Sequence, residues 1–345
     1  MSFPRPRRAL LLALASAGVL FALPATARAK KRAAANFAGR ADVQAFIDEM
    51  VARHGFVASE LREVFRHARL HPEIIAAMTP PAEAPSRSWA RYRANFVNER
   101  RIQGGLEFWA RHEQALARAE EKYGVPAEII VAIIGIETVF GRNAGNWRVI
   151  DALSTLAFNF PSRAEFFRSE LEQFLLFARD GGIDLLGVKG SYAGAIGIPQ
   201  FMPGSWRRWA VDFDGSGGID LRNSPVDAIG SVANFLVGHG WARGEPVAFP
   251  ATVEGDGWRA LAGAGIKPSL RAAALAPAGV STAATLPADA PLAFVELATP
   301  GAPSEYRIGL QNFWVITRYN RATFYAISTA ELAEAIAVQR RGQRP

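Results

Sequence analysis

The chain has 345 residues, of which 50% are hydrophobic and 21% are charged, so it is long enough for two or three structural units around a sizeable core. It contains no cysteine, which excludes disulfide frameworks, thiolate nucleophiles, iron–sulfur clusters and thiolate zinc sites. The formal net charge of +7 falls to +3 without the four arginines of residues 1–29, and a charge of that size gives no support for nucleic-acid binding.

Residues 1–29 have the order of a secretory signal peptide. A basic start is followed by an apolar stretch from Ala9 to Leu23 and by the small-residue site Ala27-Arg28-Ala29. The apolar stretch is too short to span a bilayer comfortably, although a retained N-terminal anchor is the alternative. No later stretch has the ~20 apolar residues of a membrane helix. We therefore expect a soluble periplasmic protein without a transmembrane segment in the mature chain.

Residues 40–121 carry apolar side chains at spacings of three and four, which predicts a helical domain interrupted by the proline-rich patch 79–85. The next segment predicts a buried helix from Pro126 to Phe140, because proline suits a first helical turn, Gly141 suits a helix end and the run between them is apolar on every side.

Glu137 is the exception within this apolar helix. A carboxylate near the C-terminal end of a buried helix is disfavoured by desolvation and by the helix dipole. Both effects raise its pKa, as a general acid working near neutral pH requires. The alternative is that Glu137 reaches solvent or pairs with Arg142.

The segment from Lys189 to Pro203 is rich in small residues, which allow close approach of a neighbouring backbone or of a ligand. Its uncharged hydrogen-bonding side chains are Ser191, Tyr192 and Gln200. Taken alone, this composition favours a tight packing contact over a binding site.

An aspartate-rich loop, residues 212–227, resembles the first part of an EF-hand calcium loop. Oxygen-bearing side chains occupy loop positions 1, 3, 5 and 9, with a glycine at position 6: Asp212, Asp214, Ser216, Asp220 and Gly217. Asn223 stands at position 12 in place of the usual glutamate, and Asp227 on the following helix could supply the missing carboxylate. The alternative is an Asp/Gly turn that holds no ion.

The sequence pattern changes from helical to β-like after residue 245. Short apolar runs separated by glycine and proline predict a small β-rich domain at 246–310, within which 272–291 reads as a low-complexity loop with one short helix. The segment 311–325 contains Tyr319, Asn320 and Tyr325, whose aromatic faces and amide suit sugar rings, although it could equally be a core strand. A helical pattern returns at 326–341.

Four of these segments, in this order, resemble the lytic murein transglycosylase B family, glycoside hydrolase family 103. They are Glu-Thr-Val-Phe-Gly after an apolar helix, Gly-Ser-Tyr-Ala-Gly-Ala-Ile-Gly with Gln-Phe-Met-Pro, the aspartate-rich loop with its following helix, and Ile-Thr-Arg-Tyr-Asn. The resemblance implies a mainly α (α+β) fold. Its parts would be a lysozyme-like catalytic core at 122–245, a helical domain at 40–121 joined by the helix 326–341, a small β domain at 246–310 and a return segment at 311–325 lining the core groove.

The resemblance also implies the reaction. The substrate would be the glycan strands of peptidoglycan, cut between N-acetylmuramic acid and N-acetylglucosamine to give 1,6-anhydro products. Glu137 would act as the single acid and base without a catalytic cofactor. Substrate-binding residues would be Tyr92, Arg163, Phe166, Ser191, Gln200, Tyr319, Asn320 and Tyr325, with Ser191 as a hydrogen-bond partner of the catalytic centre. A structural calcium ion would be held by Asp212, Asp214, Ser216, Gly218 and Asp227.

Some positions depart from the family pattern. Ser162 stands where a second arginine is expected, Phe166 where a tyrosine is expected, and Ile198-Pro199 where a Tyr-Gly pair is common. Two other functions remain open on the sequence: a lysozyme-type hydrolase, which would need a second, water-activating carboxylate, and a non-catalytic glycan-binding protein.

Overall fold

The computed structural model describes residues 36–79 and 88–343. The predicted signal peptide and most of the proline-rich patch lie outside the described residues. Within the described ranges, no helix is both long and apolar enough to cross a membrane. The described residues from Asn36 onward form one compact unit, so the division of this span into separate domains stays a prediction.

The first described helices are attached to the rest of the chain by an aromatic cluster. They are α1 (Ala41–His54), α2 (Ala58–His67) and α3 (Pro72–Met78). Phe46 of α1 meets Phe65 of α2 edge-on, with ring centroids 6.1 Å apart. Both rings contact Phe158 of α8 (Val149–Asn159), at 5.8 and 6.2 Å, and α3 packs against α8 as well.

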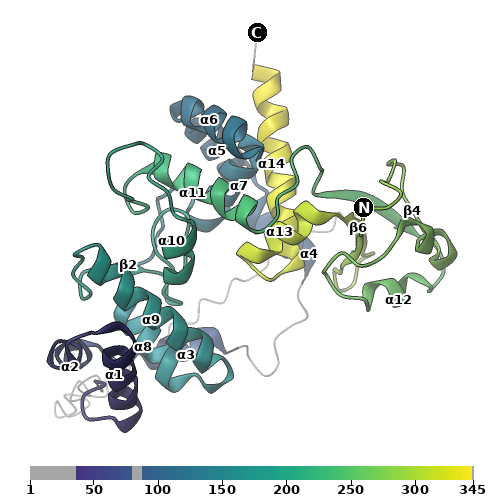
Figure 1. Cartoon of the computed structure of the whole chain (residues 1–345). Helices are drawn as coiled ribbons and strands as arrows, with labels where there is room; N and C mark the ends of the chain where they lie inside the picture. Colours follow the sequence, from purple (N-terminus) through teal and green to yellow (C-terminus); the bar gives the residue numbers. More distant parts are fainter. Residues whose placement is uncertain (1–35, 80–87, 344–345) are drawn as a thin grey trace, which may run out of the picture. The chain divides into compact units, whose positions relative to one another are not determined.

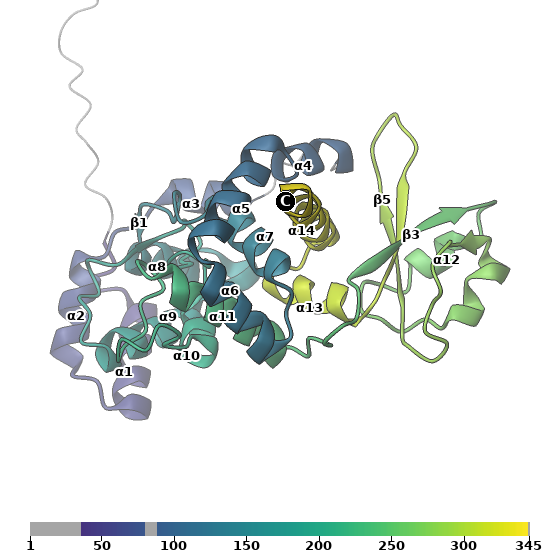
Figure 2. The same cartoon turned by 90° about the horizontal axis from the view of Figure 1, so that it is seen from above.

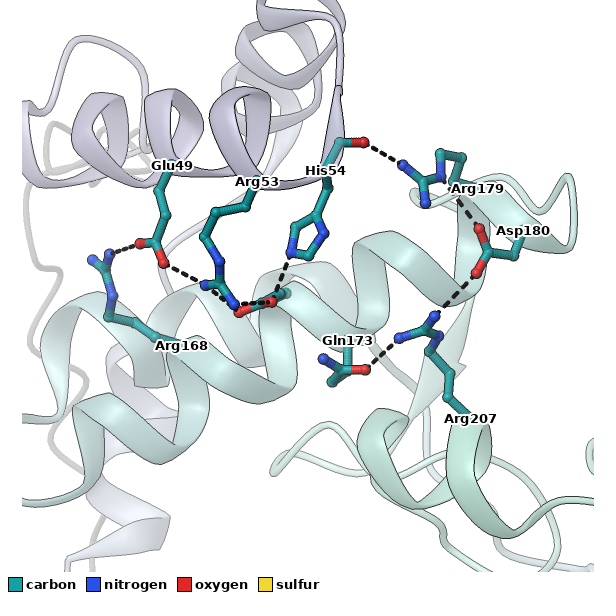
Figure 3. Close-up of polar contacts among 9 residues, drawn as sticks. Glu49, Arg53, His54, Arg168, Gln173, Arg179, Asp180 and Arg207 are labelled. Carbon is teal, nitrogen blue, oxygen red and sulfur yellow. Dashed lines mark hydrogen bonds and ion pairs between the residues drawn. The ribbon is translucent and has the colours of Figure 1, made fainter.

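A polar network reinforces this attachment (Figure 3). Arg53 and His54 of α1 contact Glu172 of α9 (Ala164–Asp180) at 3.0 and 2.7 Å, and Glu49 pairs with Arg53 at 2.6 Å. These pairs are only partly exposed, and ion pairs that solvent reaches contribute about 0–1 kcal/mol each. The buried aromatic cluster therefore provides more of the packing energy than the network does.

Helix α7 (Ala127–Thr138) is the centre of the core. Its residues from Ile129 to Ile136 are all buried, as the apolar run predicts. It packs against helices from both ends of the chain: α5 (Glu99–Arg111), α6 (Glu113–Tyr123), α11 (Pro225–Gly238) and α14 (Thr323–Gln343). Figure 2 shows α14 nearly end-on beside α5 and α7, and α4 (Trp89–Phe96) packs on α14.

The part of the chain after α7 places the glycine-rich segment beside the end of that helix. Strand β1 (Trp147–Arg148) pairs antiparallel with β2 (Lys189–Gly190), which brings Trp147 opposite Gly190. Between and after them, α8 packs along α9, α9 on α10 (Pro203–Trp209), and α10 on α11, with a short 3₁₀ helix η1 at Pro161–Arg163.

Four strands between residues 246 and 310 form an antiparallel sheet in the order β4-β3-β6-β5, visible at the right of Figure 1. They are β3 (Ala248–Val253), β4 (Val280–Ser281), β5 (Ala293–Leu297) and β6 (Glu305–Gly309). Ile308 of β6 lies opposite Phe249 and Phe294 in the two neighbouring strands. Helix α12 (Trp258–Ala262) covers the sheet with Trp258, whose ring lies 5.0 Å from that of Tyr306. The expected single helix in 272–291 is two 3₁₀ turns, η2 (Ala272–Ala274) and η3 (Ala276–Ala278).

The return segment is helical, so the alternative of a core strand at 311–325 is wrong. Helix α13 (Gln311–Tyr319) buries Phe313, Ile316 and Thr317, whose spacings of three and four form one helical face. Helix α14 begins at Thr323, three residues before the predicted start, and the earlier start places Tyr325 in its first turn.

Candidate active site and calcium loop

Helix α7 ends at Thr138, two residues earlier than predicted. Val139 and Phe140 both adopt the left-handed region, with φ of 51° and 61°. This conformation is strained for residues other than glycine, and above all for a β-branched one. The reversal turns the Phe140 ring back onto Gly104 and Gly135, where an added Cβ would lie 2.6 Å from the ring. Strain of this kind is concentrated at functional sites.

Glu137 lies in the last turn of α7, half-buried, and its Oε1 accepts a hydrogen bond of 2.6 Å from the hydroxyl of Tyr325. Burial raises the pKa of Glu137 to about 7, and the bond from Tyr325 opposes a smaller part of this shift because it favours the charged form. The alternative pairing with Arg142 is wrong, because Arg142 pairs with Glu107 at 3.4 Å on the surface. Glu137 is therefore a carboxyl group that keeps its proton close to neutral pH.

Two stacked tyrosines support Glu137. The rings of Tyr319 and Tyr325 lie 6.4 Å apart with an angle of 13° between their planes. The Tyr319 hydroxyl donates a bond of 2.5 Å to the carbonyl oxygen of Pro199. Burial, followed by the negative charge of Glu137, holds the pKa of both phenols well above its usual range. Both hydroxyls therefore remain hydrogen-bond donors while the carboxyl group of Glu137 gains or loses its proton.

Tyr92 and Gln200 lie close to this group. Tyr92 of α4 packs against Phe324, which precedes Tyr325, at 5.5 Å between ring centroids, and it also contributes to the raised pKa of Tyr325. Gln200 adopts a left-handed φ of 53°, and its amide nitrogen donates to the carbonyl oxygens of Ala144 and Gly197 at 3.0 and 2.9 Å.

The small residues around Ser191 serve close packing. An added Cβ at Gly190 would lie 2.2 Å from the carbonyl oxygen of Ala195, and one at Gly194 would lie 2.4 Å from the Leu153 side chain. The hydroxyl oxygen of Ser191 accepts bonds from the backbone N–H groups of Ala193 and Ala195, at 3.3 and 3.0 Å. The structure thus places this oxygen in its own turn, and its partnership with the catalytic centre stays a prediction.

The other expected binding residues lie on the surface. Arg163 is exposed and its guanidinium lies over the Phe166 ring, 4.5 Å from the centroid, while Phe166 is itself 40% exposed. Asn320 is exposed at the end of α13. The structure therefore joins Glu137, Tyr325 and Tyr319 by direct contacts and keeps Arg163 and Phe166 in a separate pair.

Thr138 was not predicted as a site residue from the sequence. It is buried beside Glu137, and only its place next to an anomalous carboxylate could have indicated it.

The aspartate-rich loop brings three carboxylates together. Each of Asp212, Asp214 and Asp227 offers a carboxylate oxygen within 4.8 Å of the others. Asp227 lies on α11, as predicted, and is fully buried. One of its oxygens accepts from the N–H groups of Phe213 and Asp214, at 2.8 and 3.1 Å, and the other accepts from that of Asp220 at 2.8 Å.

The remaining loop residues complete a turn around these groups. The carboxylate of Asp212 accepts from three backbone N–H groups, those of Gly215, Ser216 and Gly217, at 2.8 to 3.1 Å. The hydroxyl of Ser216 donates to the carbonyl oxygen of Gly218 at 3.1 Å. Carboxylate, hydroxyl and carbonyl oxygens are the ligands that calcium prefers, so the donor set fits this ion.

Comparisons with known proteins agree with this description. The family model described as Transglycosylase SLT domain matches residues 38–334. The membrane-bound lytic murein transglycosylase B of Escherichia coli K12 is 43% identical over 313 residues, which cover 88% of this chain and 85% of that protein. The solved structure of the lytic transglycosylase SltB1 from Pseudomonas aeruginosa has a TM-score of 0.82 and 46% identity, covering 88% of this chain and 99% of that one.

A third relative was solved with a metal. The lytic transglycosylase Slt35 of Escherichia coli, in complex with calcium, has a TM-score of 0.77 and 42% identity, covering 89% of this chain and 96% of that one. These likenesses confirm the predicted fold class, mainly α with a lysozyme-like core and small sheets. The match over most of its length shows that the chain belongs to the Transglycosylase SLT domain family.

Proposed function

We propose that the chain is a peptidoglycan lytic transglycosylase, which cleaves the β-1,4 bond between N-acetylmuramic acid and N-acetylglucosamine and leaves a 1,6-anhydro-muramic acid end. The observation that carries the proposal is the state of the Glu137 carboxyl group. Burial raises its pKa to about 7, and it accepts a hydrogen bond from the Tyr325 hydroxyl. The relative from Escherichia coli, 43% identical, is by name a murein transglycosylase.

One carboxyl group suffices for both steps of this reaction. Protonated Glu137 donates its proton to the glycosidic oxygen as the bond from that oxygen to C1 of the muramic acid breaks. The resulting carboxylate then accepts the proton of the C6 hydroxyl as this oxygen bonds to C1. Glu137 is thus reprotonated by the C6 hydroxyl, while the first proton stays on the leaving group, and no water is consumed. Tyr325 stabilises the carboxylate between the two steps by the hydrogen bond that it donates.

A lysozyme-type hydrolase is the alternative, and it would use a second carboxylate about 5 to 10 Å from the first. In the described part of the chain, no other carboxylate contributes to the pKa shift of Glu137, which burial and Tyr325 account for. Glu128 lies nine residues earlier on the same helix, which is about 13 Å along the axis. The structure therefore favours the reaction with a single carboxyl group.

The loop at 196–201 is closed by an antiparallel bridge between Ile196 and Phe201. The glycan would lie across α4, this 196–201 loop and the α13–α14 connection. Stacked aromatic rings give sugars apolar faces, and amides give them hydrogen bonds. We assign substrate contacts to the eight residues that the family resemblance implies: Tyr92, Arg163, Phe166, Ser191, Gln200, Tyr319, Asn320 and Tyr325. Because the Tyr325 side chain is buried, its contact would be made by the hydroxyl beside Glu137 and not by the face of its ring. The pair of Arg163 and Phe166 would contact one end of the glycan strand, because both side chains are exposed and are not among the residues in contact with Glu137.

Product analysis separates the candidate functions. Digestion of purified sacculi is expected to release muropeptides that end in 1,6-anhydro-muramic acid, which are one water lighter than the reducing form by mass spectrometry. Reducing ends would instead identify a hydrolase. Bound sacculi without any released product, at the level of a Glu137→Gln control, would identify a non-catalytic glycan-binding protein.

The aspartate-rich loop would hold a structural calcium ion through Asp212, Asp214, Ser216, Gly218 and Asp227. The support is the convergence of three carboxylates and the calcium complex of the 42% identical relative. Calcium would offset the mutual repulsion of these carboxylates and so stabilise the start of α11. We assign it no part in the reaction, because the proton steps at Glu137 require no metal.

We propose that the mature protein acts in the periplasm, where peptidoglycan lies. Cleavage after Ala29 is expected, so that the N-terminal sequence of the protein recovered from a soluble periplasmic extract begins at Lys30. Recovery of the uncleaved chain from washed membranes would contradict this expectation and support the retained anchor.

A further inference from the structure

We propose that Thr138 is a positioning residue for Glu137: its hydroxyl ties the last turn of α7 to the 196–201 loop and so holds the Glu137 carboxyl group against Tyr325. The inference rests on the proposed role of Glu137 as the acid. Thr138 itself faces away from solvent and would not touch the substrate, since its side chain is fully buried.

The hydroxyl of Thr138 is used as donor and as acceptor. It donates to the carbonyl oxygen of Ile198 at 2.8 Å, and it accepts from the backbone N–H of Gly141 at 2.9 Å. The first bond crosses from the helix to the loop, 60 residues away in sequence. The second closes the turn that follows the helix. The Thr138 hydroxyl therefore joins the end of α7, the turn at Gly141 and the 196–201 loop.

The loop is held from its other side by Tyr319, which donates to the next carbonyl oxygen, that of Pro199, at 2.5 Å. Tyr319 stacks on Tyr325, and Tyr325 donates to Glu137. The contacts thus run from Thr138 to the 196–201 loop, from the loop through Tyr319 to Tyr325, and from Tyr325 back to Glu137 in the last turn of α7. A displacement of the loop would move the tyrosine pair and the carboxyl group relative to each other.

The backbone is strained at the end of α7, so contacts are needed to hold it in this conformation. Val139 has a φ of 51°, which a β-branched residue adopts only when its surroundings impose it. Two contacts hold this residue: the packing of the Phe140 ring against Gly104 and Gly135, and the bond from Thr138 to Ile198. Without the second contact, we expect Val139 to relax part of the way toward ordinary helical geometry. We expect this relaxation to shift the last turn and so to weaken the hydrogen bond from Tyr325 to Glu137.

Kinetics with soluble glycan chains test this role. Thr138→Val keeps the shape of the side chain and removes the hydroxyl, and we expect kcat to fall roughly 10- to 100-fold while KM changes less than about threefold, as for a misplaced catalytic group. Thr138→Ser keeps the hydroxyl and is expected to return kcat to within about threefold of the parent. Loss of kcat in the valine variant with recovery in the serine variant supports the proposal.

Thr155→Val is the matched control for a buried hydroxyl. Thr155 of α8 is also fully buried, accepts from the N–H of His71 at 3.1 Å and donates to the carbonyl oxygen of Arg69 at 3.5 Å. We expect this variant to lose thermal stability and to keep the parental kcat per folded molecule. If Thr138→Val also keeps its kcat, or if Thr138→Ser fails to recover it, the positioning role is wrong.

Glu137→Gln, assayed in parallel, distinguishes the two proposals. If Glu137→Gln is active, the assignment of the acid fails whatever Thr138 does. If Glu137→Gln is inactive and Thr138→Val is fully active, only the role of Thr138 fails. If Thr138→Val does not fold, the hydroxyl-bearing serine variant decides the question, because reduced kcat in a serine variant of parental stability contradicts the proposal.

Discussion

Glu137→Gln is expected to lower turnover on peptidoglycan by at least ~10²-fold, since the variant has no proton to donate to the leaving oxygen. The amide has nearly the shape of the carboxyl group and can still accept the hydrogen bond from Tyr325. Release of muropeptides from sacculi, compared at equal concentrations of folded protein, measures the effect. Turnover above about a tenth of the parental value would exclude Glu137 as the general acid.

Glu128→Gln provides the matched control on the same helix. Glu128 is also half-buried, and burial also raises its pKa, but it lies in the first turn of α7. We expect this variant to keep parental turnover within about threefold, because the residue lies far from the reacting bond. Equal losses in both variants would show that any charge change in α7 disturbs the enzyme, and would remove the case for a specific acid.

Glu137→Gln is also expected to change how the free energy of unfolding depends on pH. The pKa of Glu137 is raised by folding from 4.5 to about 7, so between these values the folded state binds more protons than the unfolded state. The free energy of unfolding of the parent therefore falls as pH rises from 4.5 to 7, and this loss is complete above pH 7. Burying an ionised carboxylate costs about 1–3 kcal/mol here, since solvent reaches part of the side chain.

Glu137→Gln lacks this dependence, so its stability relative to the parent should rise across that interval and reach its maximum gain near pH 8. Urea unfolding at pH 5 and pH 8 measures the difference between the two proteins at each pH. A variant less stable than the parent at pH 8 would show that the carboxylate has stabilising partners beyond the hydroxyl of Tyr325.

The proposed catalytic carboxyl group, that of Glu137, could be found in the sequence because its anomaly is local. A glutamate at the end of eight consecutive buried residues conflicts with the helix around it, and that conflict needs no tertiary information. Its hydrogen-bond donor could not be found in the same way, because Tyr325 lies 188 residues further along the chain. The residue type of Tyr325 suited sugar binding and the family resemblance assigned it to the groove, but neither specified the contact with Glu137.

Tertiary packing also explains the errors at the element ends. Gly141 indicated where α7 should stop, but the helix stops earlier because the Phe140 ring packs into the space that Gly104 leaves on α5. The return segment 311–325 has aromatic and β-branched residues that suit a strand, yet it is helical, since Phe313, Ile316 and Thr317 are buried together at helical spacings in α13. In both places, contacts with distant residues outweigh local preference.

Asp227→Ala is expected to reduce the free energy of unfolding by about 3–5 kcal/mol even when a chelator removes calcium. The Asp227 carboxylate is fully buried and accepts from three backbone N–H groups, those of Phe213, Asp214 and Asp220. Alanine leaves these donors without a partner where water cannot easily replace it. The loop and the start of α11 would then separate.

Asp212→Ala separates the metal from this structural role. Asp212 also accepts from three backbone N–H groups, but it is exposed, so water can take the place of its carboxylate and the loss in chelator should be below about 1 kcal/mol. In the parent, calcium at about 100 times its Kd should add about 2.7 kcal/mol. Both alanine variants should lose this increment, since each removes a proposed calcium ligand.

Thermal unfolding of the three proteins, with about 10 mM calcium and with chelator, therefore has a distinctive expected pattern, given a Kd on the order of 10⁻⁴ M. The parent should melt several degrees higher with calcium, Asp212→Ala should melt like the chelated parent in both conditions, and Asp227→Ala should melt well below the chelated parent in both.

Superimposable curves for the parent with calcium and with chelator would show that the loop is a turn without an ion. A parental melting temperature for Asp227→Ala would show that the three N–H groups find other partners. Because Asp227 is the one buried carboxylate of the three, its two roles separate only in this comparison: the backbone bonds fix its contribution in chelator, and the calcium increment measures the rest.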